Sequence, residues 1–515
     1  MSGYRLVTWV GCLCAVAFGL VPNANGATRD LCPAPVSDCN SNGIEDSFEL
    51  DCNSNGLPDS CEQLDDCNAN QVADICEPPA SRVRANLAGF VACLAGPAQT
   101  PVANSPDGCP CEPFFDLDGD SDVDLADFAM LQQDGPPIPI RWWAPRWRFR
   151  VRVTVGAAGY LRTDMPAEVP MNFTAALNQV QSAVPFAPAT LRVIELDAQN
   201  AVIDESVPFQ FDPAPEFDAS TNAIGTLVVL LVGATPADAT RTYEVYFAPP
   251  AAGLPAACFE PLVQASEAGV HEGQDSYRID TAIGAWYYHK VGAGFASLDD
   301  IDGDDWIGHH PTGGSAGNYR GIPNAGPFHP GEPLCASTLE SNGPLRARIR
   351  STSIDGLWES TWDIYPRYAT MTMLRIAEPY WILYEGTPAG NLDYNTDYVV
   401  RSTGQQTPVS VTWAEDIPAP EWVYFGDAAT DRMLYVAHHG DDLESDQFWQ
   451  MQRNMTVFGF GRQQPCCDAY LTTVPDRFTY GLAEVQSFAE AAQLIEGVWR
   501  ELDVTVSPAE AYPIP

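Results

Sequence analysis

Hydrophobic and polar positions after residue 146 form short strand-like runs, and the first of these alternates with the period of two that half-buried β-strands show. The clearest case is RFRVRV at residues 148–153, where arginines alternate with Phe and Val. Further strand-like runs, LRVIELD, GTLVVLLVG and RTYEVYF, are separated by turn residues. This pattern predicts an antiparallel β-sandwich over residues 146–265, which we interpret as a support or binding domain.

Residues 266–515 are again rich in strand patterns and are predicted to form a larger, supersandwich-like β-sandwich. In RARIRSTSIDGLWESTWDIY, Asp355–Gly356 has the chemistry of a two-residue hairpin turn. Pairing about this turn places Arg348 opposite Asp363, and Ile349 beside Trp362 on the other face. Near the end, apolar residues recur at helical spacing and predict a helix that packs on the core, through Val485, Phe488, Ala492, Ile495, Trp499 and Leu502. The predicted fold class is therefore mostly β.

The N-terminus has the pattern of a secretory signal peptide over residues 1–27. Arg5 precedes an apolar run at residues 6–21, and small residues follow at a plausible cleavage point. No later run is apolar for the length that a bilayer requires. We therefore expect an exported protein, secreted or held at the cell surface, with no membrane span.

Residues 28–80 combine closely spaced cysteines with three copies of a twelve-residue acidic pattern. Oxygen-bearing side chains at alternating positions of such a loop converge on one Ca²⁺ ion. The predicted ligands are Asp38, Asn40, Asn42, Asp46 and Glu49 in the first copy, Asp51, Asn53, Asn55, Asp59 and Glu62 in the second, and Asp66, Asn68, Asn70, Asp74 and Glu77 in the third. The cysteines are expected to form disulfides, whose pairing the sequence leaves open. The alternative is a disordered acidic linker.

Residues 81–135 contain a duplicated helical pattern, since NLAGFVACL matches DLADFAMLQ at the positions of Leu87, Ala88 and Phe90. The second copy continues from another calcium-type loop, with ligands predicted at Asp116, Asp118, Asp120, Asp124 and Asp127. A proline-rich linker, residues 136–145, follows.

The copies DCNSNGIEDSFE and DCNSNGLPDSCE resemble thrombospondin type 3 repeats, and the duplicated unit resembles a dockerin-type, EF-hand-like module. The first resemblance implies that calcium and disulfides replace a hydrophobic core. The second implies calcium binding and a cohesin-like or cell-surface partner.

The formal net charge of -42 argues against a nucleic-acid partner and against anionic membranes, because phosphate binding depends on basic patches. It favours cations, and Ca²⁺ is the expected cofactor.

The stretch Trp286–Pro330 gathers four of the seven histidines, the single lysine and an acidic run. Imidazoles titrate near working pH and suit acid–base chemistry, although any one of them is commonly a hydrogen-bonded structural residue. Lys290 could lose its proton if it were desolvated. The candidate catalytic residues are His289, Lys290, His310, Tyr319, Arg320, His329, Arg348, Asp363, Tyr365, His438 and His439.

The run LDDIDGDDW within this stretch allows two interpretations. Asp300, Asp302 and Asp304 alternate about a glycine and could bind a metal ion. Equally, they could form a solvated acidic turn.

An exported, calcium-stabilised protein with an aromatic-rich β-domain is typical of proteins that act on extracellular polysaccharide. In architecture the C-terminal region resembles β-sandwich polysaccharide lyases, which implies elimination. A cation, Arg348, Arg320 or calcium, would then neutralise a uronic acid, and His289, His310 or Tyr365 would take the proton. Hydrolysis by a pair such as Asp363 and Glu385 is the second hypothesis. A non-catalytic, glycan-binding or adhesive protein is the third. We expect the stretch Trp286–Pro330 to lie beside the arginine face of the Asp355–Gly356 hairpin.

Overall fold

The computed structural model describes residues 38–40, 45–49, 51–52, 55, 57–64, 66, 73–74, 86–97, 99–106, 109–117, 120–133, 142–144, 146–463 and 468–512. The predicted signal peptide and the predicted ligands Asn42, Asn53, Asn68, Asn70, Glu77 and Asp118 lie outside these residues. In the described part of the chain, no helix has the length and apolar character needed to cross a bilayer.

The N-terminal part contains short helices joined by disulfides. The helices are η1 (Asp46–Phe48), η2 (Asp59–Cys61), α2 (Leu87–Cys93), α3 (Cys111–Phe115) and α4 (Leu125–Gln133). Cys39 is bonded to Cys61, and Cys93 to Cys111. The duplicated phenylalanines of α2 and α4, Phe90 and Phe128, stack with ring centroids 6.2 Å apart, so the two related helices contact each other as pseudo-repeats.

The first β-sandwich consists of a sheet in the order β28-β1-β7-β3-β4, with β29 also on β1, and a second sheet, β2-β6-β5. Its elements are β1 (Phe149–Gly156), β2 (Arg162–Asn172), α5 (Phe173–Gln179), η4 (Pro188–Thr190), β3 (Arg192–Leu196), β4 (Val202–Asp204), β5 (Phe209–Pro213), β6 (Ile224–Thr235), β7 (Thr240–Phe247), η5 (Pro250–Ala252), β28 (Asp503–Val506) and β29 (Glu510–Ala511). The alternating pattern at residues 148–153 forms β1, with Val151 and Val153 buried.

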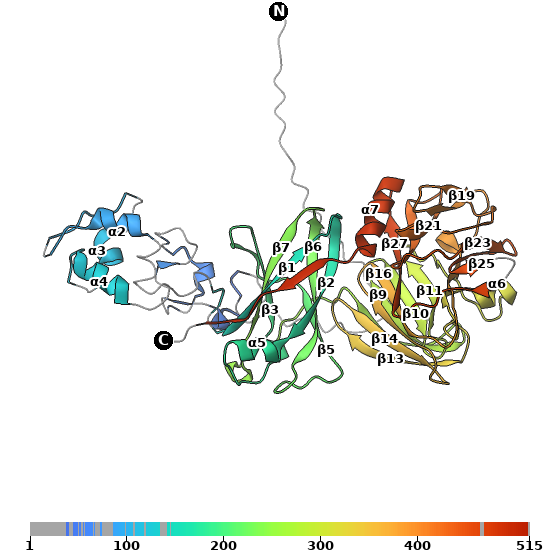
Figure 1. The fold of residues 1–515 in the computed structure, drawn as a ribbon, viewed down its shortest axis with the longest axis horizontal. Helices are drawn as coiled ribbons and strands as arrows, with labels where there is room; N and C mark the ends of the chain where they lie inside the picture. Colours follow the sequence, from blue (N-terminus) through green and yellow to red (C-terminus); the bar gives the residue numbers. More distant parts are fainter. Residues whose placement is uncertain are drawn as a thin grey trace, which may run out of the picture. The chain divides into compact units, whose positions relative to one another are not determined.

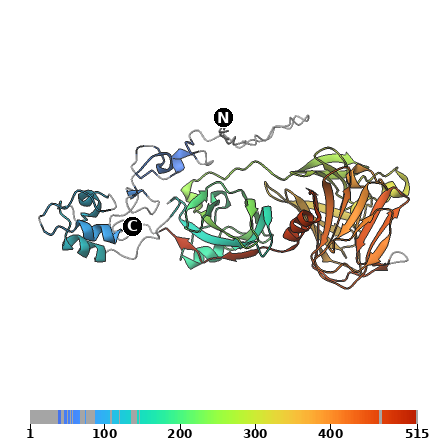
Figure 2. The same ribbon diagram turned by 90° about the horizontal axis from the view of Figure 1, so that it is seen from above.

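The last two strands join the chain's end to this first sandwich. Thr154 of β1 pairs with Thr505 of β28, and Phe149 pairs with Ala511 of β29. Figure 2 shows the C-terminal segment, in red, running along the first sandwich. The predicted boundary placed everything after residue 266 in the large domain. Strand pairing instead returns residues 503–511 to the first sandwich.

The large β-sandwich packs two nine-stranded antiparallel sheets, so the predicted mostly-β fold class is confirmed (Figure 1). The first, which we name the β10 sheet, has the order β20-β23-β24-β17-β12-β11-β10-β9-β8. Its strands are β8 (Gln264–His271), β9 (Gln274–Thr281), β10 (Gly284–His289), β11 (Gly294–Asp300), β12 (Gly321–Asn324), β17 (Ile382–Gly386), β20 (Trp413–Glu415), β23 (Asp446–Met451) and β24 (Met455–Phe460).

The second, the β14 sheet, has the order β13-β14-β15-β16-β27-β22-β21-β18-β19. Its strands are β13 (Cys335–Asn342), β14 (Ala347–Ser353), β15 (Glu359–Ile364), β16 (Tyr368–Arg375), β18 (Asp397–Arg401), β19 (Gln406–Pro408), β21 (Glu421–Asp427), β22 (Arg432–His438) and β27 (Asp476–Glu484). The remaining elements are α6 (Gly314–Tyr319), η6 (Pro388–Gly390), β25 (Arg462–Gln463), β26 (Asp468–Ala469) and α7 (Phe488–Trp499).

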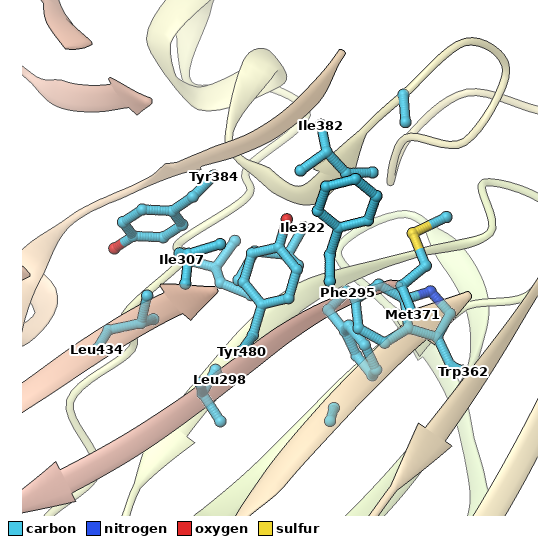
Figure 3. Packing of buried hydrophobic residues seen from close by; sticks show 14 of the residues in the cluster. Phe295, Leu298, Ile307, Ile322, Trp362, Met371, Ile382, Tyr384, Leu434 and Tyr480 are labelled. Atoms are coloured by element: carbon cyan, nitrogen blue, oxygen red, sulfur yellow. The ribbon is translucent and has the colours of Figure 1, made fainter. Parts of the chain in front are cut away.

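A single hydrophobic core fills the space between these two sheets. Figure 3 shows Phe295 and Tyr384 from the β10 sheet and Trp362, Met371 and Tyr480 from the β14 sheet packing together. The Phe295 and Trp362 rings meet edge to face, 4.7 Å between centroids. Side chains that alternate with these core residues point to the outer face of either sheet.

The predicted hairpin register is confirmed, because Arg348 pairs with Asp363 and Ile349 with Trp362. The turn itself is longer than predicted. The β14 and β15 strands end at Ser353 and Glu359, and the Ser353 N–H donates to the Trp358 carbonyl at 3.0 Å. Residues 354–357 therefore form a four-residue loop, in which Gly356 has φ +73°.

The predicted C-terminal helix is α7, and it lies against β22 of the β14 sheet. Ala491 and Ile495 are buried there with Val228 and Leu230 of the first sandwich. Phe488 departs from the prediction because it stays 40% exposed. Helix α7 and the first sandwich thus cover part of the outer face of the β14 sheet.

Candidate functional site

Buried polar groups collect on the outer face of the β10 sheet, where strands β12, β17, β24 and β23 lie side by side. Ile382 and Tyr384 of β17 point into the core, so Leu383 and Glu385 point outward. Strand pairing places further residues on the same outer face. Glu385 pairs with Val457, which pairs with Trp449, and Leu383 pairs with Gly459, which pairs with Gln447.

Glu385 is the central carboxyl of this face and is only 5% exposed. Its Oε2 accepts a hydrogen bond from Asn324 Nδ2 at 2.9 Å and lies 3.8 Å from His329 Nε2. Burial raises the pKa of Glu385 to about 7, although Asn324 and the charge of Arg462 act in the opposite direction. A carboxyl with this pKa exchanges its proton at neutral pH, as a general acid or base requires.

Four imidazoles form a row that ends at Glu385. Ring centroids are 6.5 Å apart from His271 to His289, 5.4 Å from His289 to His309, and 6.2 Å from His309 to His329. Burial lowers the pKa of all four, to about 3 for His289. The row is therefore neutral at pH 7.

Main-chain carbonyls fix where these imidazoles carry their protons. His289 Nε2 donates to the His271 carbonyl at 2.9 Å, and His289 Nδ1 accepts from the Gly331 N–H at 3.1 Å. His329 Nε2 donates to the Tyr319 carbonyl at 3.1 Å, so its N–H lies beside the Glu385 carboxyl. Of the predicted histidines, His329 has the position of a catalytic group, and the bonds of His289 are structural.

Arg462 lies on the same face, between two tryptophans. Its guanidinium carbon is 3.8 Å from the Trp449 ring centroid and 5.2 Å from that of Trp381. Arg462 lies close to Gly459, because its Cβ is 3.6 Å from the position that a Cβ on Gly459 would take. Burial lowers the pKa of Arg462 to about 10, which leaves the guanidinium charged at neutral pH.

A pocket of about 530 Å³ opens beside this cluster. Trp358, Tyr380, Trp381 and Tyr470 line it, with Glu378 and Asp468 as its acidic residues; we name it the aromatic pocket. Asn324 also lines it and, through its amide, contacts Glu385. Asn324 thus links the pocket to the buried carboxyl, and the aromatic rings of the pocket offer apolar faces of the kind that sugar rings pack on.

Lys290, which is on the same sheet, does not behave as the sequence hypothesis requires. Its Nζ contacts Glu267, and it donates to Asp275 Oδ2 at 2.8 Å. Burial lowers the pKa of Lys290, but the bonds to Asp275 and Glu267 outweigh it, and the net pKa is raised. The expectation of a deprotonated lysine is therefore wrong.

Other candidate residues of the stretch Trp286–Pro330 contact neighbouring protein groups and do not line the aromatic pocket. His310 is exposed and contacts Glu272 at 2.8 Å. Arg320 donates to the main-chain carbonyls of Gly308 and Asn454 at 3.1 and 2.7 Å. Tyr319 is 49% exposed and offers its carbonyl to His329.

The arginine face of the hairpin is not the neighbour of this site. Ala347 and Ile349 of β14 are buried in the core, so Arg346, Arg348 and Arg350 point to the outer face of the β14 sheet. The imidazoles point from the outer face of the β10 sheet, on the other side of that core. The expected adjacency is wrong, and Asp363 cannot pair with Glu385 across the core.

Instead, the hairpin arginines are held by carboxylates. Arg346 contacts Glu168 and Asp212 of the first sandwich, and its Nη1 is 3.6 Å from Asp363. Arg348 Nε donates to Asp363 Oδ1 at 2.6 Å. The Tyr365 hydroxyl donates to Glu168, and burial raises its pKa. Arg348, Asp363 and Tyr365 are therefore parts of an ion-pair cluster.

The adjacent histidines of β22 face opposite ways, as the alternation along a strand predicts. His438 Nδ1 is 2.6 Å from Glu421 Oε2, and its Nε2 is 3.0 Å from Asp476 Oδ1. Burial lowers the pKa of His438, but these bonds raise it to about 10. His439 contacts the Trp499 carbonyl at 2.9 Å, and burial lowers its pKa to about 3. Both are structural.

The acidic turn does not converge on a metal position. Asp300 Oδ2 accepts from Arg432 Nη1 at 2.5 Å and from Trp306 Nε1 at 3.0 Å, and its Oδ1 accepts from the Asp302 and Asp304 N–H groups. Arg432 also contacts Asp302 at 3.0 Å. These contacts favour the interpretation of the run as an acidic turn, with Arg432 as its counter-ion.

Two of the predicted calcium loops bring carboxylates together. In the first, oxygens of Asp38, Asp46 and Glu49 lie within 4.8 Å of one another. In the loop between α3 and α4, the converging residues are Asp122, Asp124 and Asp127. Asp127 also accepts from the Leu117 and Asp124 N–H groups.

Sequence reasoning missed Asn324, Gln447, Trp449 and Arg462, and named Glu385 only as a partner of Asp363. The available signal was a lone carboxylate within the apolar strand WILYEG, because a charge at such a position is buried and needs a reason. Which polar groups from β12, β23 and β25 meet it depends on sheet order, which one sequence does not reveal.

No family model matches the chain, and no curated protein matches it. Among solved structures, an alpha-mannosidase from Enterococcus faecalis V583 is similar with 11% identity and a TM-score of 0.39, over 70% of this chain and 47% of that one. The structure of HI1317 has 11% identity and a TM-score of 0.30, over 44% of this chain and 97% of that one. The chain thus spans about half the length of the mannosidase. Likeness at these TM-scores carries no argument about function.

Proposed function

We propose that the large sandwich binds a polysaccharide in the aromatic pocket and cleaves it by elimination, with Glu385 as the base. The observation that carries the proposal is the buried Glu385 carboxyl, held by Asn324, which also lines that pocket. Ionised Glu385 takes a proton from a ring carbon. The C–O bond on the neighbouring carbon then breaks, a C=C bond forms, and the protonated Glu385 returns its proton to the leaving oxygen.

Elimination fits the site better than hydrolysis by a carboxylate pair. The hypothesis of paired Asp363 and Glu385 fails because the core separates them. The acidic residues of the pocket, Glu378 and Asp468, are exposed, and exposed carboxyls favour ionisation over proton donation. Glu385 alone can serve elimination, first as the base and then, once protonated, as the acid, whereas hydrolysis by a carboxylate pair needs a second carboxyl beside it.

A polysaccharide screen tests this function. The full-length protein is incubated with a panel of acidic and neutral polysaccharides while ultraviolet absorbance reports the unsaturated product and a separate assay reports new reducing ends. We expect both signals to rise together. New reducing ends without absorbance would mean hydrolysis, and binding with neither signal would leave a glycan-binding protein.

Glu385→Gln is the matched variant, because it keeps the hydrogen bond to Asn324 but cannot take a proton. We expect kcat to fall by roughly 100- to 10,000-fold. In the unmodified protein, kcat/KM should rise with pH through about 7, where the Glu385 carboxyl ionises. A profile that is flat there, or a Gln variant of undiminished activity, would contradict the role of Glu385.

For the N-terminal part we propose calcium binding in an exported protein. The support is the convergence of Asp38, Asp46 and Glu49, which are positions 1, 9 and 12 of the predicted loop, together with disulfides such as Cys39–Cys61 and Cys93–Cys111, which are typical of oxidising compartments.

Chelation tests the calcium proposal. With EGTA, we expect a non-specific protease to cleave the first 135 residues at least tenfold faster, while the two sandwiches keep their resistance. Asp46→Asn should weaken Ca²⁺ binding, measured by titration calorimetry. Unchanged proteolysis with and without Ca²⁺ would refute calcium as the stabilising cofactor.

A further inference from the structure

We propose that Arg462 and Gln447 form a subsite for the carboxylate of an acidic sugar, so that the substrate class is a uronic-acid polysaccharide. This inference rests on the proposed function, since it names the substrate of the same pocket. Elimination requires a group that neutralises the anion next to the carbon that loses its proton, and the pair stands where such a group is needed.

The first observation is a buried arginine that forms no ion pair within the described residues, although the charge of Glu385 acts on it from a distance. Arg462 is 5% exposed, and its Nε and Nη1 have no hydrogen-bond partner within the described residues. A guanidinium removed from water with its N–H groups unpaired is strongly destabilised, so such groups are normally paired. Its planar fork matches a carboxylate in two parallel hydrogen bonds.

The second observation is a buried amide in the same condition. Gln447 is fully buried, and neither its Nε2 nor its Oε1 has a partner among the described residues. Gln447 pairs through the sheet with Gly459, above which the Cβ of Arg462 lies. The Gln447 amide therefore offers a donor and an acceptor on the same face of the sheet as Arg462, for a carboxylate oxygen and a ring hydroxyl.

Trp381 connects this pair to the aromatic pocket. One part of its ring lines the pocket, and its centroid is 5.2 Å from the guanidinium carbon of Arg462. Its Nε1 is also buried and unpartnered in the described structure. A sugar packed on Trp381 thus faces Arg462 on one side and, through Asn324, Glu385 on the other.

Matched sugars test the subsite. Uronic-acid tetrasaccharides and the same compounds with every carboxylate reduced to a hydroxymethyl group are titrated while tryptophan fluorescence is recorded, because Trp381 and Trp449 flank Arg462. At least one acidic tetrasaccharide should bind ten- to hundredfold more tightly than its reduced form. In Arg462→Gln this ratio should fall to about one, with binding of the reduced form unchanged.

Gln447→Glu provides a second variant, because it keeps the shape and places a negative charge where the carboxylate would bind. It should weaken the binding of acidic sugars at least tenfold and leave the binding of reduced sugars unchanged. If Arg462→Gln fails to fold, this variant tests the subsite in its place. Equal binding of both forms by the unmodified protein would overturn the subsite and leave carbohydrate binding standing. If neither form bound, the proposed function would fall as well.

Discussion

The two outer faces of the large sandwich both carry charged side chains, but they differ in how those charges are paired. On the β14 sheet, buried Arg346 contacts Glu168, Asp212 and Asp363. On the β10 sheet, buried Arg462 and Gln447 have polar atoms without partners in the described structure. One face is closed by the first sandwich, and the other keeps hydrogen-bonding capacity that only a ligand or water can satisfy.

The difference separates charges that hold domains together from charges that are available for binding. A paired buried charge stabilises the fold only through its partners, so its removal leaves those partners exposed to an apolar environment. An unpaired buried charge destabilises the free protein, and the binding of an anion removes this destabilisation. The following substitutions test this contrast.

Arg346→Met should give the largest effect. It leaves Glu168 and Asp212 without their shared cation, and we expect the free energy of unfolding to fall by about 3–5 kcal/mol. Urea unfolding measures the loss. Cleavage of polysaccharide at low temperature should persist, since the substitution is on the other side of the core; parallel losses of stability and of sugar binding would break the contrast.

The next effect is a pH dependence of stability caused by Glu385. Its carboxyl holds its proton up to about pH 7 in the folded protein, against the ordinary 4.5. Between these values the folded state binds more protons, so the free energy of unfolding should fall as the pH rises, by on the order of 3 kcal/mol in total. Glu385→Gln should remove the share of this slope that Glu385 contributes, measured as the difference between the two proteins in unfolding at pH 4, 6 and 8.

Arg462→Met should have the opposite sign from Arg346→Met. It replaces an unpartnered buried cation by an apolar side chain of similar length, and we expect the protein to gain about 1–2 kcal/mol while losing the preference for acidic sugars. Thermal unfolding and the fluorescence titration report the two quantities. A clear destabilisation would show that Arg462 has a structural partner.

Lys290→Met should have the smallest effect. Glu267 and Asp275, its partners, are 69% and 60% exposed, and exposed ion pairs contribute at most about 1 kcal/mol. The free energy of unfolding should change by at most about 1 kcal/mol, and kcat should stay within twofold of that of the unmodified protein. A large loss of kcat would instead support a catalytic role for Lys290, which the raised pKa of Lys290 argues against.

Local pattern predicted much of the fold. A period of two predicted β1, strand-like runs between turn residues predicted β3, β6 and β7, and the turn chemistry of Asp355–Gly356 predicted the register of Arg348 with Asp363. The strands β28 and β29 were missed, because their pairing with β1 joins residues more than 300 positions apart and depends on the whole topology.

The candidate site was predicted in part, for a related reason. His329 was identified by residue type, but Arg348 was chosen for its charge without knowledge of which sheet face it occupied. Whether a charge is satisfied depends on its neighbours in space. Arg346 and Arg462 are both buried arginines, and only Glu168 and Asp212, contributed by the first sandwich, make them different.

The return of the chain to β1 makes the large sandwich an insertion between β7 and β28 of the first one. Two covalent crossings therefore join the two bodies, one on each side of the inserted residues. A single proteolytic nick in either crossing would leave the inserted body tethered to the N-terminal region. Release from its anchoring point would need two cuts.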